Sequence, residues 1–266
     1  MSFLTTNRGL KWHYETTGQG DAILLIHGFG GSSRWWRRQQ EFLQRDFQVI
    51  TVDLPGHGQS DWAPVTLVDM AIDIRQILNT LHVSHVTVIA SSFGGLVALE
   101  LYRLMPSLVM RMSFVGVIPK FARGPNYPAG LDIDRIRTLS AQFDGNYASI
   151  LEIFFRSLFT MKERNSDAFK ELKNLRNDEP LPKREALKAF LDILEKADLR
   201  DRIASVICPV QFITGSEDYI CPKVIMEWVE EHAYNARFDF IDHCGHLPFL
   251  TDTKEYNRML EDFLIS

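Results

Sequence analysis

The chain has 266 residues, of which 45% are hydrophobic and 24% charged, and this composition and length suit one α/β domain with a sizeable core and an insertion. Its net charge of −5 offers no basic field, so neither nucleic acid nor an anionic membrane surface is expected as a partner. No apolar run could span a bilayer and the polar N-terminus does not resemble a signal peptide, so we expect a cytoplasmic protein.

Strand and helix patterns alternate along the first half of the chain. Residues 3–6 and 11–16 alternate in polarity around Asn7-Arg8-Gly9, which predicts a hairpin. The continuous apolar run Ala22–Ile26 is typical of a strand buried on both faces of a parallel sheet. It ends in a glycine-rich loop, His27–Ser32. Further patterns predict helices over Arg34–Arg45 and Thr66–Leu81 and strands over Phe47–Val52 and Met112–Val117.

The stretch Val86–Glu100 reads as a strand, a sharp turn and a helix, with a serine at the apex. It matches the G-x-S-x-G nucleophile elbow, with Ala90 in the place of the first glycine. The chain passes close to the apex two residues before and two residues after it, so small residues are needed there. Ser92 has Ala90 and Gly94 at these places and Ser91 has no such pair, so Ser92 is the candidate nucleophile.

The alternation stops after Pro119, and residues 120–200 show helical patterns only. They lie near Ile133–Phe143, Tyr147–Met161, Asp167–Arg176 and Lys183–Lys196. We predict a helical lid over residues 120–200, inserted into a core of residues 1–119 and 201–266. Ligands of open α/β sheets bind at the carboxyl ends of the strands, which is where such a lid would lie.

The last third returns to strand and helix. A strand over Val210–Thr214 is followed by Asp218, and a strand over Phe238–Ile241 is followed by His246. Helices are expected over Pro222–Glu231 and Thr253–Leu264.

Ser92, Asp218 and His246 therefore follow three different strands in the chain order of one known type of catalytic triad. A serine hydroxyl is a weak nucleophile that needs a base within hydrogen-bond reach, and the base needs an orienting acid. We assign His246 as the base and Asp218 as the acid. Glu217 is the alternative acid and His243 the alternative base.

The oxyanion of an acyl-transfer reaction needs backbone donors. The amide of Phe93 at the start of a helix is one candidate, and the amide of Phe29 in the glycine-rich loop is the other. An apolar stripe of Phe154, Phe155, Leu158 and Phe159 either lines an acyl tunnel or packs the lid interior. We carry Phe155 and Phe159 forward as candidate substrate contacts.

The sequence indicates no metal site and no cofactor. Its histidines show no H-E-x-x-H, and its glycine-rich segments match neither a P-loop nor a dinucleotide fingerprint. The three cysteines (Cys208, Cys221, Cys244) form no C-x-x-C motif and fit a reducing compartment.

Over nearly its whole length the chain resembles the α/β-hydrolase superfamily. A closer resemblance, to the pimeloyl-[acyl-carrier protein] methyl ester esterase family, rests on Lys120–Arg123, Tyr127–Gly130, Phe155–Met161 and Ile193–Arg200. It implies a carboxylesterase of biotin synthesis, with the catalytic residues at Ser92, Asp218 and His246 and substrate contacts at Phe29, Phe93 and the segment from Phe155. It also implies an acyl-carrier protein as a possible partner, with Lys170 and Lys173 supplying positive charge.

The predicted function is hydrolysis of a short- to medium-chain acyl ester, small or carrier-bound, through an acyl-enzyme. Two alternatives stay open at this point. One is a C–C bond hydrolase of ring-cleavage products, and the other is a non-catalytic receptor on the same fold.

Overall fold

A computed structural model describes residues 2–124, 127–128 and 130–266. Ala129, which belongs to the segment Tyr127–Gly130 quoted above, lies outside the described residues.

The strands of the described residues form one eight-stranded sheet in the order β1-β2-β4-β3-β5-β6-β7-β8. Strand β2 pairs antiparallel with β1 and β4, and all other neighbouring strands are parallel. The predicted mostly parallel sheet with flanking helices is thereby confirmed. In chain order the strands are β1 (Ser2–Thr5), β2 (Lys11–Thr17), β3 (Ala22–Ile26), β4 (Gln48–Val52), β5 (Val86–Ser91), β6 (Val109–Val115), β7 (Val210–Gly215) and β8 (Ala236–Ile241).

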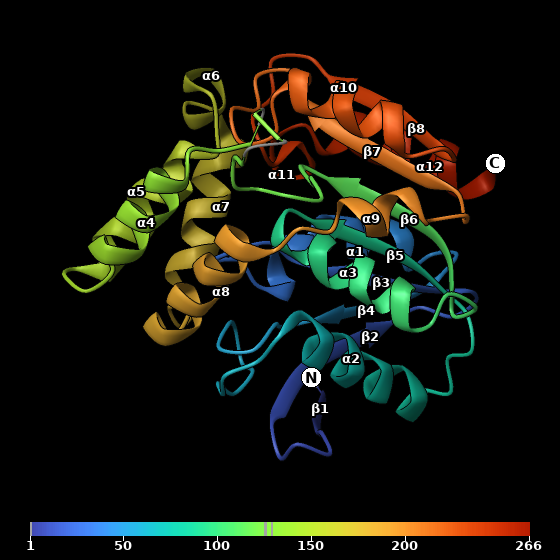
Figure 1. Ribbon diagram of the computed structural model, residues 1–266. Helices are drawn as coiled ribbons and strands as arrows, with labels where there is room; N and C mark the ends of the chain where they lie inside the picture. Colours follow the sequence, from blue (N-terminus) through green and yellow to red (C-terminus); the bar gives the residue numbers. More distant parts are fainter. Residues whose placement is uncertain (1, 125–126, 129) are drawn as a thin grey trace.

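Helices cover both faces of this sheet, as Figure 1 shows. Helices α2, α3 and α9 pack together on one face, and α1 and α12 pack together on the other. The central strands β3 and β5 are apolar and buried because helices lie on both sides of them. The helices of the core are η1 (Ser33–Trp36), α1 (Arg37–Leu43), α2 (Leu67–Thr80), α3 (Phe93–Leu104), α9 (Arg200–Ala204), α10 (Lys223–His232), α11 (Pro248–Thr251) and α12 (Thr253–Ile265).

Five helices between β6 and β7 stand apart from these layers, and we call residues 133–196 the helical block. Figure 1 shows the block gathered at the left, beside the sheet. Its helices are α4 (Ile133–Gln142), α5 (Tyr147–Ser157), α6 (Met161–Arg164), α7 (Asp167–Asn177) and α8 (Arg184–Lys196). The segment before the block also carries two isolated bridges, Ala122 with Leu131 and Gly124 with Tyr127, where only helical patterns had been expected.

Some element boundaries differ from the predicted ones. Strand β6 begins at Val109 rather than Met112, because the charged Arg111 interrupts the apolar run and hides the start of the strand in the sequence. The pattern over Tyr147–Met161 is split into α5 and α6. The split occurs because Thr160 and Glu163 form a capping box, each side chain accepting a hydrogen bond from the other residue's amide, which starts a new helix.

Within the described residues, none of the helices combines the length and the apolar character that crossing a bilayer requires.

Candidate active site

Ser92 lies at the apex of the predicted turn between β5 and α3. Its φ of 49° and ψ of −118° place it in a strained backbone region, as the elbow requires. A Cβ atom on Gly94 would lie 2.6 Å from the carbonyl oxygen of His27, so only glycine fits two residues after the apex. The Ser92 amide donates to the Val115 carbonyl at 2.9 Å, which ties the apex to the end of β6.

Asp218 and His246 are joined by a hydrogen bond of 2.8 Å between His246 Nδ1 and Asp218 Oδ2. Both side chains are buried. The other carboxylate oxygen of Asp218 accepts from the amides of Ile220 and Cys221 at 2.8 and 3.0 Å, which holds the carboxylate in one orientation. Asp218 can therefore fix which nitrogen of His246 carries the proton.

The alternative acid and base are also paired, but with each other. His243 Nδ1 lies 3.3 Å from Glu217 Oε1, and the two side chains are 71% and 52% exposed. A solvated pair of this kind holds no side chain in a fixed geometry, because water competes for its hydrogen bonds. The geometry favours Asp218 and His246 over Glu217 and His243.

The second nitrogen of His246, Nε2, is buried and has no hydrogen-bond partner among the described residues. The imidazole lies directly over Gly116, where a Cβ atom would come within 2.6 Å of the His246 Cε1 atom. Gly116 follows Val115, the residue that binds the Ser92 amide. The free nitrogen thus lies at the same end of the sheet as the Ser92 hydroxyl, and no hydrogen bond joins the two among the described residues.

The loop after β3 lies against the elbow. A Cβ atom on Gly28 would lie 3.1 Å from the Ser92 Cβ atom, so Phe29 follows a point of close approach. The Phe29 amide donates none of the backbone hydrogen bonds found among the described residues. The Phe93 amide belongs to the first turn of α3, where amides have no partner within the helix. Both amides are available to an oxyanion.

His57 holds this loop from the side, a role that the sequence did not reveal. Its Nδ1 donates to the Pro55 carbonyl at 3.1 Å, and its Nε2 accepts from the Gly30 amide at 3.3 Å. Burial, with the neighbouring His27, lowers the pKa of His57 to about 3. The ring is therefore neutral at physiological pH and accepts the hydrogen bond of the Gly30 amide.

Asp53 connects the loops after β3 and β4. It accepts from the amides of Ser33 and Gln59 at 2.7 and 2.9 Å and from His13 Nδ1 at 2.8 Å. Burial alone would raise the pKa of Asp53, but these hydrogen bonds and the nearby His27 outweigh burial and lower it to about 2. The carboxylate stays charged and holds the two loops together.

Ser92 lines a cavity of about 150 Å³ between the sheet and the helical block. The lining is mostly apolar, and most of it comes from the block and the segments beside it: Phe29, Ser92, Phe121, Leu131, Arg135, Ile136, Leu139, Phe154, Leu191, Leu194, Tyr219 and Ile220. Such a cavity suits an acyl chain.

Two of the predicted substrate contacts do not lie in this cavity. Phe155 and Phe159 pack against each other and against Phe169 inside the block, and the Arg176 guanidinium lies 3.7 Å over the Phe155 ring. The stripe therefore packs the interior at these two positions, and the Phe155 ring also meets Trp35 of the core at 5.7 Å. Phe154 is the member that lines the cavity, and its ring meets Phe29 edge to face at 5.2 Å.

The ring of Phe93 is also absent from the cavity lining. It stacks on Phe190 of α8 at 4.1 Å, and Phe190 stacks in turn on His57 at 4.9 Å. The ring of Phe93 thus packs against the helical block, and only its amide remains a candidate for the site.

The helical block also holds the loop that carries His246. The Leu158 carbonyl accepts from the His246 amide at 2.8 Å, and the buried Glu163 carboxylate accepts from the Gly245 amide at 3.0 Å. Glu163 accepts from the Thr251 hydroxyl as well. The T-x-x-E pattern from Thr160 to Glu163 was readable as a helix cap, but its link to the base required the structure.

Asp218, Cys221 and His246 place potential metal ligands within 4.8 Å of one another. Their chemistry does not suit a cation. The Nδ1 and carboxylate atoms already bind each other, and burial raises the pKa of the Cys221 thiol, which donates to the Gly116 carbonyl. A protonated thiol is a poor ligand, so we assign no metal here.

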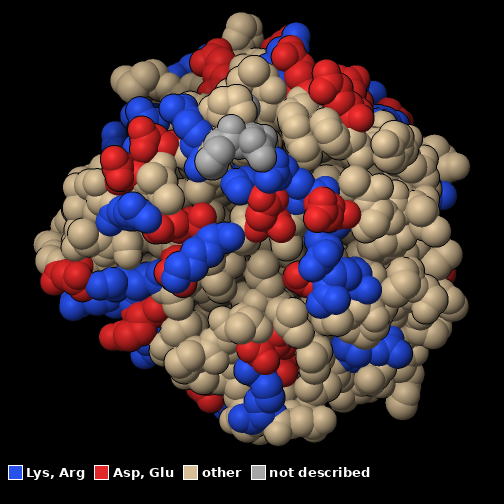
Figure 2. Space-filling view, viewed as in Figure 1, with Lys and Arg blue, Asp and Glu red and all other residues tan. Residues whose placement is uncertain are grey.

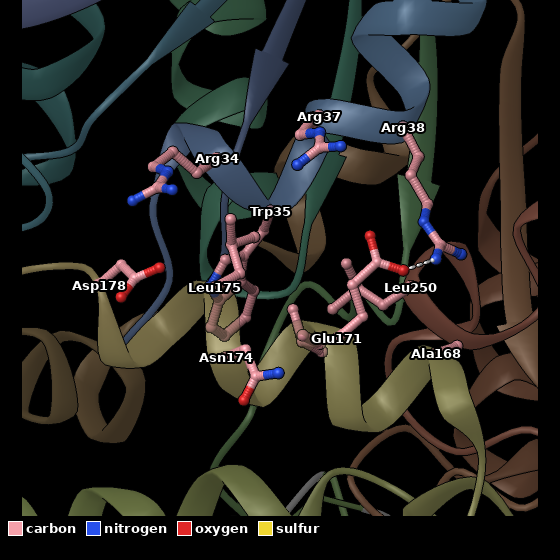
Figure 3. A pocket seen from close by; sticks show the side chains of 11 residues that line it. Arg34, Trp35, Arg37, Arg38, Ala168, Glu171, Asn174, Leu175, Asp178 and Leu250 are labelled. Carbon is pink, nitrogen blue, oxygen red and sulfur yellow. Dashed lines mark hydrogen bonds and ion pairs between the residues drawn. The ribbon is translucent and has the colours of Figure 1, made fainter.

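A second hollow of about 250 Å³ lies between α1 and α7, away from Ser92 (Figure 3). Three arginines point into it, but each already faces an acid: Arg34 with Glu179, Arg37 with Glu41 and Arg38 with Glu171. Among the described residues, no serine, threonine or cysteine lines it, so the Ser92 cavity is the better substrate site.

Comparisons with known proteins agree with this geometry. Residues 23–259 match the family described as "Alpha/beta hydrolase family". Pimeloyl-[acyl-carrier protein] methyl ester esterases of Nitrosomonas europaea and Pseudoalteromonas atlantica are 30% and 31% identical, over 92% and 94% of this chain and 96% and 94% of theirs. An esterase from Exiguobacterium antarcticum superposes with a TM-score of 0.91 at 24% identity, covering 100% of this chain and 99% of that one, which supports the fold.

Proposed function

The chain belongs to the alpha/beta hydrolase family and is a carboxylic ester hydrolase, and we propose that its substrate is the methyl ester of pimeloyl-acyl-carrier protein. The substrate is inferred from the curated relatives, which carry that name. The observation that carries the proposed mechanism is the buried His246, bonded to Asp218 through Nδ1 and with Nε2 free beside the elbow.

In the first half of the reaction, His246 Nε2 takes the proton of the Ser92 hydroxyl as its oxygen attacks the ester carbonyl carbon. Asp218 stabilises the imidazolium that forms. The carbonyl oxygen becomes an oxyanion, which the amides of Phe29 and Phe93 bind. The tetrahedral intermediate then expels methoxide, which leaves as methanol with the proton from His246, and an acyl-Ser92 ester remains.

In the second half, water attacks the acyl-enzyme while His246 takes its proton. The second tetrahedral intermediate expels the Ser92 oxygen, which recovers its proton from His246, and the carboxylic acid is released. The Ser92 cavity holds the acyl chain through both halves, with Phe29 and Phe154 as walls. We propose that residues 120–200 act as its lid.

The reaction is placed in the cytoplasm as part of the same proposal. The cysteines Cys208, Cys221 and Cys244 are free thiols, as is usual for proteins of a reducing compartment. An acyl-carrier protein is the proposed partner, since it carries the pimeloyl group.

The proposal is tested by labelling with a fluorophosphonate probe and by complementing a biotin auxotroph that lacks its methyl esterase. We expect an adduct on Ser92, and growth with the native gene but not with Ser92→Ala. Absence of an adduct in folded protein would favour the receptor alternative. An adduct without complementation would reject the substrate but not the enzyme class.

A further inference from the structure

A third hollow, of about 440 Å³, adjoins the Ser92 cavity at Tyr219. The two hollows share the Tyr219 side chain, which lines both. The Tyr219 hydroxyl is hydrogen-bonded at 2.8 Å to the hydroxyl of Ser157, which lines the third hollow. A ligand that extended from Ser92 into the third hollow would have to pass this bond, going from a mostly apolar lining to a more polar one.

The third hollow is lined by two cations that form no ion pair among the described residues. Lys162 and Arg164 line it, and neither forms an ion pair within the described part of the chain. Arg164 is oriented by its Nε donating to the Phe159 carbonyl at 3.0 Å, which leaves other guanidinium N–H groups for a ligand. On the face of the molecule that Figure 2 shows, Lys and Arg side chains are interspersed with Asp and Glu.

A third cation lies on the side of Tyr219 that belongs to the Ser92 cavity. Arg135 lines the Ser92 cavity and likewise forms no ion pair within the described residues. Burial and the charge of Asp218 raise the pKa of the Tyr219 hydroxyl. The hydrogen bond with Ser157 and the charges of Arg135 and Arg164 oppose that rise. One acid, Glu217, lines the third hollow, and it faces His243. Asp218 is next to Tyr219 in the chain, but its carboxylate is bonded to His246. Arg135, Lys162 and Arg164 therefore remain as cations around Tyr219 that form no ion pair within the described residues.

Resting on the function proposed above, we propose that the third hollow binds an anionic group at the end of the substrate far from the methyl ester. Arg164 and Lys162 hold that group, and Arg135 attracts it at the boundary. A phosphate on a pantetheine arm and a free carboxylate share the required chemistry. Lys170, which was expected to serve a carrier protein, is bonded to Asp167 on the exposed face of α7 and takes no part.

The test measures binding to Ser92→Ala by calorimetry, so that it does not depend on turnover. One pair of ligands is methyl pimeloyl-pantetheine with and without its phosphate. The other pair is monomethyl pimelate, which has a free carboxylate, and dimethyl pimelate, which has none. The first pair reports a phosphate and the second a carboxylate.

We expect Arg164→Ala and Lys162→Ala each to weaken binding of the anionic ligand in one of the two pairs about fivefold to tenfold. Binding of the neutral ligand of the same pair should stay unchanged. The effect should shrink at high salt. Arg137→Ala and Lys170→Ala are the matched controls, because they remove the same charges from acid-bonded positions in the block.

Equal affinity for charged and neutral ligands in both pairs would overturn the proposal, as would equal effects of the test and control variants. Neither result bears on the labelling of Ser92, so this failure can be told apart from failure of the proposed function.

Discussion

The carboxyl end of the sheet and the helical block are built on different interactions. At the sheet end, buried polar groups have specific hydrogen-bond partners: His57 binds Gly30, Asp53 binds Ser33, and Asp218 binds His246, among others. In the block, aromatic rings pack inside and ion pairs such as Arg137 with Glu195 lie outside. Hydrogen bonds fix direction whereas apolar packing tolerates variation, so the first region suits chemistry and the second suits substrate selection.

The sharpest test of this contrast compares neighbouring serines. Ser92→Ala should lower kcat by about a thousandfold or more, because the nucleophile is lost. Ser91→Ala is the matched control, since the buried Ser91 hydroxyl has no hydrogen-bond partner among the described residues and its removal leaves nothing unpaired. Steady-state hydrolysis of p-nitrophenyl esters measures both. Similar losses in the two variants would contradict the choice of nucleophile.

The orienting acid is tested in the same way. Asp218→Asn should lower kcat by about a hundredfold to ten-thousandfold with little change in KM, because the amide cannot hold the required tautomer of His246. Glu217→Gln should stay near the native rate, since its partner His243 is solvated. A larger loss of kcat in Glu217→Gln than in Asp218→Asn would identify Glu217 as the orienting acid instead.

Glu163 is where the two regions meet, and removing it should affect both. Glu163→Ala leaves the amides of Gly245 and Thr160 without their acceptor and should destabilise the fold by about 2–4 kcal/mol. We also expect kcat to fall about tenfold, because the loop before His246 loses its anchor. Urea unfolding and kinetics at a temperature where the variant is folded measure the two effects.

Glu163→Gln supplies the control, because it keeps an acceptor oxygen and should recover most of kcat. A variant that is destabilised but retains its native kcat would restrict Glu163 to stability.

The lowered pKa of Asp53 predicts how the stability of the protein changes in acid. Its folded pKa of about 2 is below the ordinary 3.8, so its contribution to stability is complete above about pH 4 and is lost as the pH falls towards 2. The contribution amounts to about 2 kcal/mol. Urea unfolding between pH 6 and pH 2.5 should show a steeper loss in the native protein than in Asp53→Asn.

The smallest effects should come from the block. Phe155→Leu should cost about 1 kcal/mol of stability and leave the acyl preference unchanged, because Phe155 packs inside. Phe154→Leu should shift the preferred acyl length, because Phe154 lines the cavity. Rates of hydrolysis across a series of p-nitrophenyl esters distinguish the two variants. A shift of the preferred acyl length in the Phe155 variant would show that Phe155 contacts the substrate.

Local sequence patterns predicted the elbow, the ends of the strands and the order of Ser92, Asp218 and His246. They could do so because small residues and apolar runs report backbone geometry directly. Side-chain direction was harder to predict. Phe154 and Phe155 are adjacent and chemically alike, and only the orientation of α5 decides that the first faces the cavity. The same holds for His57, whose partner Gly30 is distant in sequence.

The sequence by itself determined the sheet, the position of the nucleophile and which residues could serve it, since each follows from short-range sterics and polarity. Only the tertiary structure decided which acid meets which base, which rings face the ester, and that the block holds the His246 loop. Those outcomes depend on contacts between residues far apart in the chain, and no local pattern encodes the meeting of two distant surfaces.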